Sequence, residues 1–149
     1  TKRIERFEKC IPKDWKEGYE NVIIALTCEN QEKADKRIPL FLNCKIKHRY
    51  IFVAPILEEV DLSKYLKTDK IDLVSVSGES YENARVCDFS WVAHIKETCD
   101  KHQVKFDFHQ TGSNFRMNGK TYKISHFKEY EQAKKGLQVL EKSKTEGEK

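Results

Sequence analysis

Hydrophobic runs of strand length recur along the chain and are separated by segments with helical spacing. Apolar, β-branched or aromatic residues dominate four of these stretches. Short apolar runs bounded by turn residues are typical of buried strands. The predicted strands cover residues 21–28, 49–56, 72–78 and 104–110.

The segments between the strands have the periodicity of amphipathic helices. Helices are predicted over 2–10, 31–42 and 88–102, the last with Asp88 or Ser90 as its N-cap. Regular alternation of strands and helices predicts parallel strands joined by right-handed crossovers.

The C-terminal part of the chain has a different character. The pair Asn118-Gly119 between alternating residues predicts a tight β-hairpin over 115–124, and an amphipathic helix is predicted over 126–142. The expected organisation is a β/α unit at 1–112, a hairpin and helix packed on it at 113–142, and a disordered tail at 143–149.

Three of the predicted strands have one apolar and one small or polar face, because strand side chains alternate. The apolar sets are expected to lie under the helices. The opposite sets end, in chain order, in Glu29, Glu79 and His109. Ligands bind at the carboxyl ends of parallel strands, so these three residues are the predicted catalytic residues.

A polar inner face favours a β/α barrel over an open doubly wound sheet, which needs apolar residues on both faces. A full barrel takes eight strands and about 250 residues, whereas this chain has 149 residues and four predicted strands. The expected fold class is therefore α/β, a half parallel β/α barrel. Its open edges predict either a missing N-terminal half-barrel, in a longer protein, or self-association.

Four stretches resemble an uncharacterised family of phage and bacterial proteins in their order and spacing. They are ENVIIALTCENQEKADKRIPLFL, VAPILEEVDLSKYL, DLVSVSGESYENARVCDFSWVAHIKETC and VKFDFHQTG. The family has S-V-E-N-Q-x-x-A-D-x-R-I-P, E-P-L, G-G-E-S-G-x-x-A-R-P and K-Q-W-G at these places, and its members resemble radical-SAM barrels. The chain departs from it at Ala54, Ser77, His109 and Thr111, which stand for Glu, Gly, Lys and Trp.

The resemblance implies a ligand site at the family's polar positions. The ligand-binding residues it implies are Asn30, Gln31, Gly78, Ser80, Arg85 and Gln110. It also implies a 4Fe–4S cluster and S-adenosylmethionine in the full-length protein, held by an upstream half. Two functions stay open: a radical-SAM-like enzyme of unknown reaction, inactive without its other half, and a catalytically degenerate binding or interaction module.

Each candidate also has a structural alternative. Glu29 and Glu79 are suited to hydrogen bonds with backbone amides at the next helix start. His109 is suited to a bond with Asp107 or Glu79, and Arg85 to an ion pair with Glu79 or Glu82.

For Arg37 and Lys134 a structural role is favoured over a functional one. Arg37 is expected to pair with Asp35 or Glu32 on its own helix, and Lys134 to lie on a solvated helix face.

Charge and cysteine usage narrow the function classes. Charged residues make up 35% of the chain, but the formal net charge is only +4. Such a mixed surface does not favour nucleic acid as the partner, while a small anionic ligand remains a candidate. No apolar run reaches the roughly 18 residues of a membrane span.

The five cysteines lie far apart without a C-x-x-C pair. This spacing indicates reduced thiols of a cytoplasmic protein and predicts no metal site in the chain itself.

Overall fold

The structure, a computed structural model, describes residues 1–147, with side chains through Lys142. In chain order the elements are η1 (Ile4–Arg6), α1 (Phe7–Cys10), β1 (Ile23–Thr27), α2 (Gln31–Asn43), β2 (His48–Val53), α3 (Ser63–Leu66), β3 (Leu73–Ser77), β4 (Cys87–Asp88), α4 (Phe89–Lys101), β5 (Lys105–Gln110), β6 (Asn114–Met117), β7 (Lys120–Lys123), η2 (His126–Lys128) and α5 (Glu129–Gly147). Within the described residues, no helix combines the length and apolarity needed to cross a membrane.

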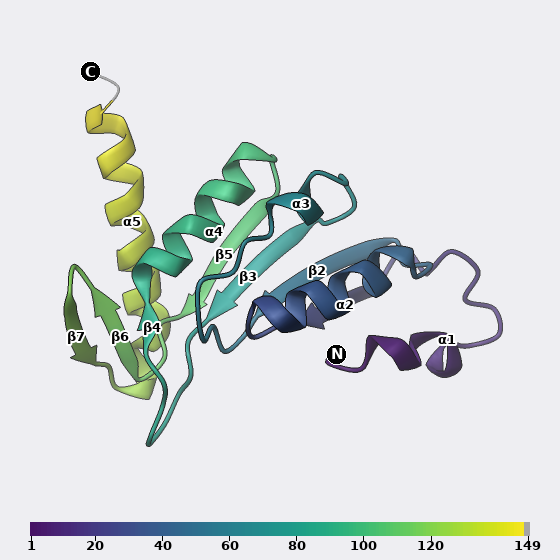
Figure 1. The fold of residues 1–149 in the computed structure, drawn as a ribbon, viewed down its shortest axis with the longest axis horizontal. Coiled ribbons are helices and arrows are strands. Elements are labelled where there is room, and N and C mark those ends of the chain that lie inside the picture. The colour runs from purple at the N-terminus through teal and green to yellow at the C-terminus, as the bar shows by residue number, and fades with distance from the viewer. Residues whose placement is uncertain (148–149) are drawn as a thin grey trace.

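Four parallel strands form the main sheet in the order β1-β2-β3-β5. Helices α2, α3 and α4 all lie on one side of it (Figure 1). Paired residues of neighbouring strands form a buried row under these helices, with Leu26 opposite Ile51 and Ile51 opposite Val74. The predicted α/β fold with alternating strands and helices is confirmed, and the sheet does not close into a barrel.

Side-chain caps fix where the two long helices over the sheet begin. The Asn30 side chain accepts a hydrogen bond from Lys33 N at 3.0 Å and starts α2. Asp88, one of the two predicted caps, accepts from Ser90 N at 2.9 Å and starts α4. Asp88 also binds Arg116 Nε at 2.6 Å, which ties this helix start to β6.

The predicted hairpin is present as the antiparallel pair β6–β7, turning at Asn118-Gly119 with φ values of 52° and 75°. Strand β4 pairs in parallel with β6 and was not predicted. Helix α5 continues to Gly147, so the tail predicted at 143–149 begins inside a helix, and residues 148–149 lie outside the described part. This hairpin and α5 gather beyond β5 (Figure 1).

One residue, Thr1, pairs with the outer edge of β1 as a further strand would. The amino group of Thr1 donates to Ala25 O at 2.6 Å, and Thr27 N donates to Thr1 O at 2.8 Å. These two bonds are those of a parallel ladder. Backbone groups of alternate residues face alternate sides of a strand. The backbone N–H groups of Ile23 and Ala25 therefore also face this outer edge.

A cluster of phenylalanines joins the sheet, α4 and the hairpin. Phe108 on β5 is fully buried, and its ring centroid lies 6.3 Å from that of Phe89 and 6.1 Å from that of Phe115. The Phe108 side chain thus joins β5 to the elements that precede and follow it in the chain, α4 and β6.

Truncation of this cluster is expected to be costly. Phe108→Ala should lower the free energy of unfolding by about 3–5 kcal/mol, since it removes a buried ring and leaves a cavity. Phe127→Ala is the matched control: that ring is 94% exposed, so its loss should change stability by less than about 0.5 kcal/mol. Urea unfolding monitored by circular dichroism measures both, and equal losses would contradict the assigned core.

Candidate functional site

The face of the sheet opposite the helices carries a cavity of about 330 Å³. The predicted polar sets of β3 and β5 line it, as strand alternation required. Two aromatic residues of β2, Tyr50 and Phe52, also line it and were not identified from the sequence. The complete lining is Tyr50, Phe52, Ala54, Leu73, Ser75, Ser77, Asp107 and His109.

Asp107 organises the polar end of this cavity. Lys134 Nζ donates to its Oδ1 at 2.6 Å, and Ser75 Oγ donates to its Oδ2 at 3.1 Å. His109 Nδ1 lies 3.7 Å from the same Oδ2, and the His109 ring meets the edge of Tyr130 at 5.8 Å between centroids. Lys134 was expected on a solvated face. That expectation is wrong, because α5 packs on β5 and brings Lys134 to the carboxylate.

Glu29 follows β1 and forms an ion pair with Arg37 of α2 at 2.8 Å, while Lys2 Nζ lies 3.7 Å from it. Burial tends to raise the pKa of Glu29, but the hydrogen bond and charge of Arg37, with Lys2, lower it below its usual value. The expected pairing of Arg37 with Asp35 or Glu32 is wrong. The helix points Arg37 back to the strand end, and Asp35 binds residues of α3 instead.

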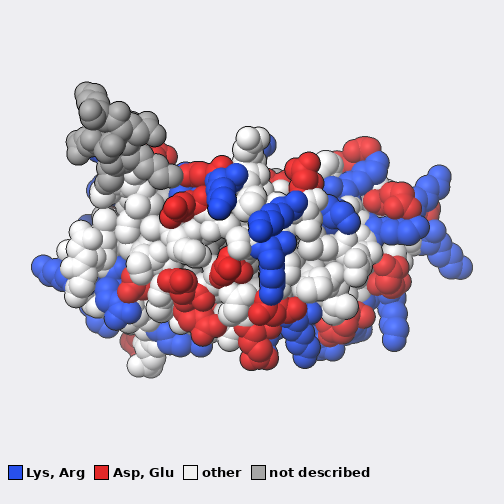
Figure 2. All heavy atoms as spheres, turned by 45° about the horizontal axis from the view of Figure 1, so that its top comes forward, with Lys and Arg blue, Asp and Glu red and all other residues white. Residues whose placement is uncertain are grey.

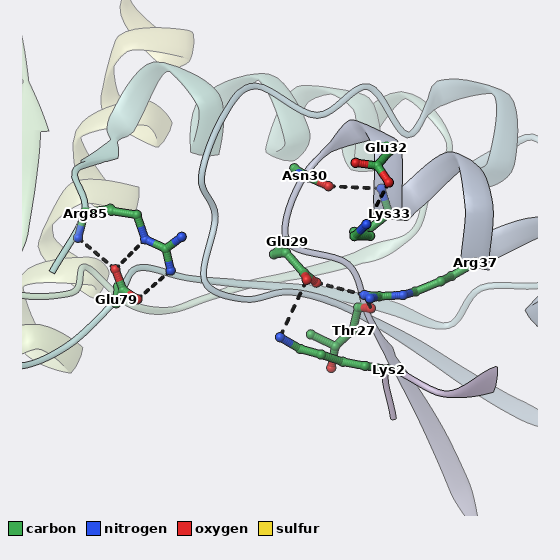
Figure 3. Close-up of polar contacts among 9 residues, drawn as sticks. All are labelled: Lys2, Thr27, Glu29, Asn30, Glu32, Lys33, Arg37, Glu79 and Arg85. Carbon is green, nitrogen blue, oxygen red and sulfur yellow. Dashed lines mark hydrogen bonds and ion pairs between the residues drawn. The ribbon is translucent and has the colours of Figure 1, made fainter. Parts of the chain in front are cut away.

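Glu79 follows β3 and accepts three hydrogen bonds from Arg85. Its carboxylate accepts from Arg85 N at 2.8 Å, Nε at 2.8 Å and Nη2 at 2.6 Å. The Arg85 side chain and backbone lower the pKa of Glu79 to about 2. Glu79 in turn raises the pKa of Arg85, and Glu29 adds to this effect. Figure 3 shows both ion pairs, with Glu79 directed toward Arg85 and Glu29 directed toward Arg37 and Lys2.

Gly78 is required by a close approach of the chain to itself. A Cβ at this position would lie 2.1 Å from Thr111 O and 2.9 Å from Cys87 Cβ. A Cβ at Gly112, which has a φ of 72°, would lie 2.5 Å from Glu79 O. The backbone after β5 therefore occupies the space beside Gly78 that the sequence had suggested for a ligand.

A buried carboxylate, Glu129, fixes the turn after Gly78 and was not predicted. It is 1% exposed and accepts from Ser80 Oγ at 2.6 Å and Ser113 Oγ at 2.8 Å. Gln110 Nε2 donates to Ser80 Oγ at 2.8 Å and so joins the same network. No sequence pattern marks Glu129, because it falls among the exposed acids of an amphipathic helix.

The predicted site residues thus fall into separate groups. Among the described residues, no hydrogen bond joins Glu29, Glu79 and His109 to one another; only His109 lines the cavity. Asn30 caps α2, and Gln31 binds the segment before α3 through Asp61 N and O. The arrangement supplies one histidine held near a carboxylate inside the cavity, and two carboxylate–guanidinium pairs at the strand ends.

The cysteines do not fit an iron–sulfur cluster. Burial raises the pKa of Cys28, Cys87 and Cys99 to about 12, so each is a neutral thiol. All five cysteines are free, and within residues 1–147 no three His, Cys, Asp or Glu side chains are grouped to hold a metal. Cluster ligands are thiolates that converge on one point, which these residues do not provide.

Removal of the Arg85 side chain should raise the pKa of Glu79 from about 2 toward 4.5, its ordinary value. The pKa is depressed in the folded state, so the pair stabilises the fold above about pH 4.5, and this contribution is lost as the pH falls toward 2. Arg85→Met tests this by NMR titration of the Glu79 carboxyl group. Arg116→Met, which breaks a different ion pair, is the control. An unchanged Glu79 titration in Arg85→Met would contradict the assignment.

Gly78→Ala should destabilise the fold by about 3 kcal/mol or more, because the new methyl group would overlap backbone atoms that cannot rotate away. Gly119→Asn is the matched control. Its position is open to solvent, and asparagine tolerates its φ of 75°, so a loss below about 1 kcal/mol is expected. Thermal and urea unfolding compare the two variants. A Gly78→Ala protein of normal stability would contradict the close approach.

Comparison with known proteins gives one match. A family model described as a protein of unknown function, DUF5131, matches residues 1–146. No curated protein matches the chain, and no solved structure matches it. The family match spans the β/α unit, the hairpin and most of α5. The chain therefore belongs to the DUF5131 family of proteins of unknown function.

Proposed function

We propose that this chain is the ligand-binding, C-terminal part of a radical-SAM-like β/α barrel protein. Its ligand site lies at the carboxyl ends of the strands and on the face of the sheet opposite α2, α3 and α4, called the helix-free face because α5 reaches it only at β5. The observation that carries the proposal is the cavity on that face, which holds His109 near Asp107.

The exposed helix-free face supports the proposal that this chain is one half of a barrel. Parallel sheets are normally covered on both faces. Here Ile23 is 50% exposed and Phe52 is 37% exposed on the uncovered side. A second set of parallel strands, from the N-terminal half-barrel, would bury both side chains and turn the cavity into a barrel interior.

Ligand binding and proton transfer fall to different residues in this proposal. Glu79 stays ionised at neutral pH and fully engaged, so its role is to hold Arg85. The Arg85 side chain remains 58% exposed, and its planar fork is suited to a carboxylate or phosphate of the ligand. His109 is the proton donor or acceptor, with its imidazole oriented by Asp107.

The radical-SAM part of the proposal rests on the motif resemblance of residues 20–112. Since the cysteines of this chain do not fit a cluster, a 4Fe–4S cluster and S-adenosylmethionine would be held by the N-terminal half of the complete protein. No step of the proposed role of His109 or Arg85 depends on them.

A catalytically degenerate binding module is the second candidate. It is favoured by the two strand-end ion pairs, because Glu29 and Glu79 are both closed by arginines. In this case Arg85 and the cavity bind a ligand, and no chemistry follows.

The first test is the iron and sulfide content of the complete gene product, purified without oxygen. The enzyme proposal predicts a stoichiometric cluster with a visible absorption band. It also predicts the same content in the Cys10→Ser/Cys44→Ser variant, because these two thiols are not ligands. A stable protein without iron would contradict the radical-SAM proposal and leave the binding module.

A further inference from the structure

A second groove, of about 860 Å³, lies between the loop after β3, the hairpin and η2. It shares no residue with the cavity on the helix-free face. Its lining combines two aromatic rings with amide, hydroxyl and charged side chains: Tyr81, Glu82, Asn83, Ser113, Asn114, Lys123, Ile124, Ser125 and His126. We propose that this groove binds a planar heterocycle with an attached phosphate, the chemistry of a nucleoside monophosphate.

An aromatic platform forms one wall of the groove. The rings of Tyr81 and His126 lie 4.7 Å apart between centroids at an interplanar angle of 31°. Tyr81 is 70% exposed, which leaves its outer surface open to a further ring. Stacking on exposed aromatic side chains is the general means of holding a base.

Polar contacts hold the Tyr81–His126 platform in place. Tyr81 N donates to Ser113 Oγ at 2.8 Å, and the Tyr81 hydroxyl lies 3.3 Å from His126 Nε2. His126 Nδ1 lies 3.4 Å from the buried carboxylate of Glu129. Tyr81 also has a φ of 76°, which bulky side chains rarely adopt. Such conformations cluster at ligand sites, because surrounding contacts must enforce them.

An unsatisfied acceptor in the lining points to a ligand that donates hydrogen bonds. Asn114 binds Ala84 O through Nδ2, while its Oδ1 is buried and has no hydrogen-bond partner among the described residues. A buried polar atom without a partner is costly. A turn of the Asn114 side chain toward the groove would let this oxygen accept from an N–H group on the edge of a heterocycle.

Charge on the rim supports the phosphate. Lys123 lines the groove and is exposed, and its ammonium is suited to a phosphate as a point charge. Glu82, the one acidic residue of the lining, can accept hydrogen bonds from sugar hydroxyls. Figure 2 shows acidic and basic side chains interspersed over one face of the molecule.

The test is calorimetric titration of the full chain with AMP, adenosine and inorganic phosphate as probes. AMP should bind saturably with a Kd below about 1 mM, and more tightly than adenosine. Tyr81→Leu should weaken AMP binding roughly five- to a hundred-fold through lost stacking, whereas Tyr81→Phe should retain it. Lys123→Ala should remove the advantage of AMP over adenosine.

Matched controls lie on the same hairpin. Tyr122→Leu and Lys120→Ala change an exposed ring and a charge that do not line the groove, and both should bind AMP normally. The proposal is overturned if none of the nucleotide probes binds saturably, or if Tyr81→Leu and Tyr122→Leu bind AMP equally well. Self-association that Tyr81→Leu abolishes, without AMP binding, would also overturn it in favour of a protein-docking surface.

Discussion

Coverage of a parallel sheet on only one face is the constraint on which the rest of this structure depends. Parallel strands normally bury both faces, and here α2, α3 and α4 protect one. Helix α5 reaches the other only at β5, where Lys134 meets Asp107. The uncovered part of that face contains the cavity with His109, and it ends at the strand edge that carries Glu29 and Glu79.

Close backbone packing and hydrogen bonds fix the arrangement of the strand ends. Gly78 lets Thr111 pass within contact of the turn after β3. Glu129 then accepts from Ser80 of that turn and from Ser113 of the segment after β5. The turn then presents Glu79 to Arg85 in one arrangement. A guanidinium held in this way is pre-organised for an anion, which reduces the entropy lost on binding.

Much of the fold was predictable from local patterns. The four strands, the helices over them and the hairpin at Asn118-Gly119 follow from periodicity and turn chemistry. Alternation also assigned the polar faces of β3 and β5 correctly. It failed on β2, where Tyr50 and Phe52 alternate with apolar residues on the other face, so the sequence shows no contrast.

Contacts between distant segments were the part that the sequence did not show. Glu129, Lys134 and Arg37 look like ordinary charges of amphipathic helices, and only the docking of their helices gives them partners at the strand ends. The short strand β4 was likewise not predicted, because two residues carry no periodicity.

Backbone amide hydrogen exchange at the outer edge of β1 tests the half-barrel account most directly. The amides of Ile23 and Ala25 face outward, so they should exchange rapidly in this chain. In the product of the complete gene, the account predicts strong protection of both amides. Equally rapid exchange at Ile23 and Ala25 in both proteins would contradict it.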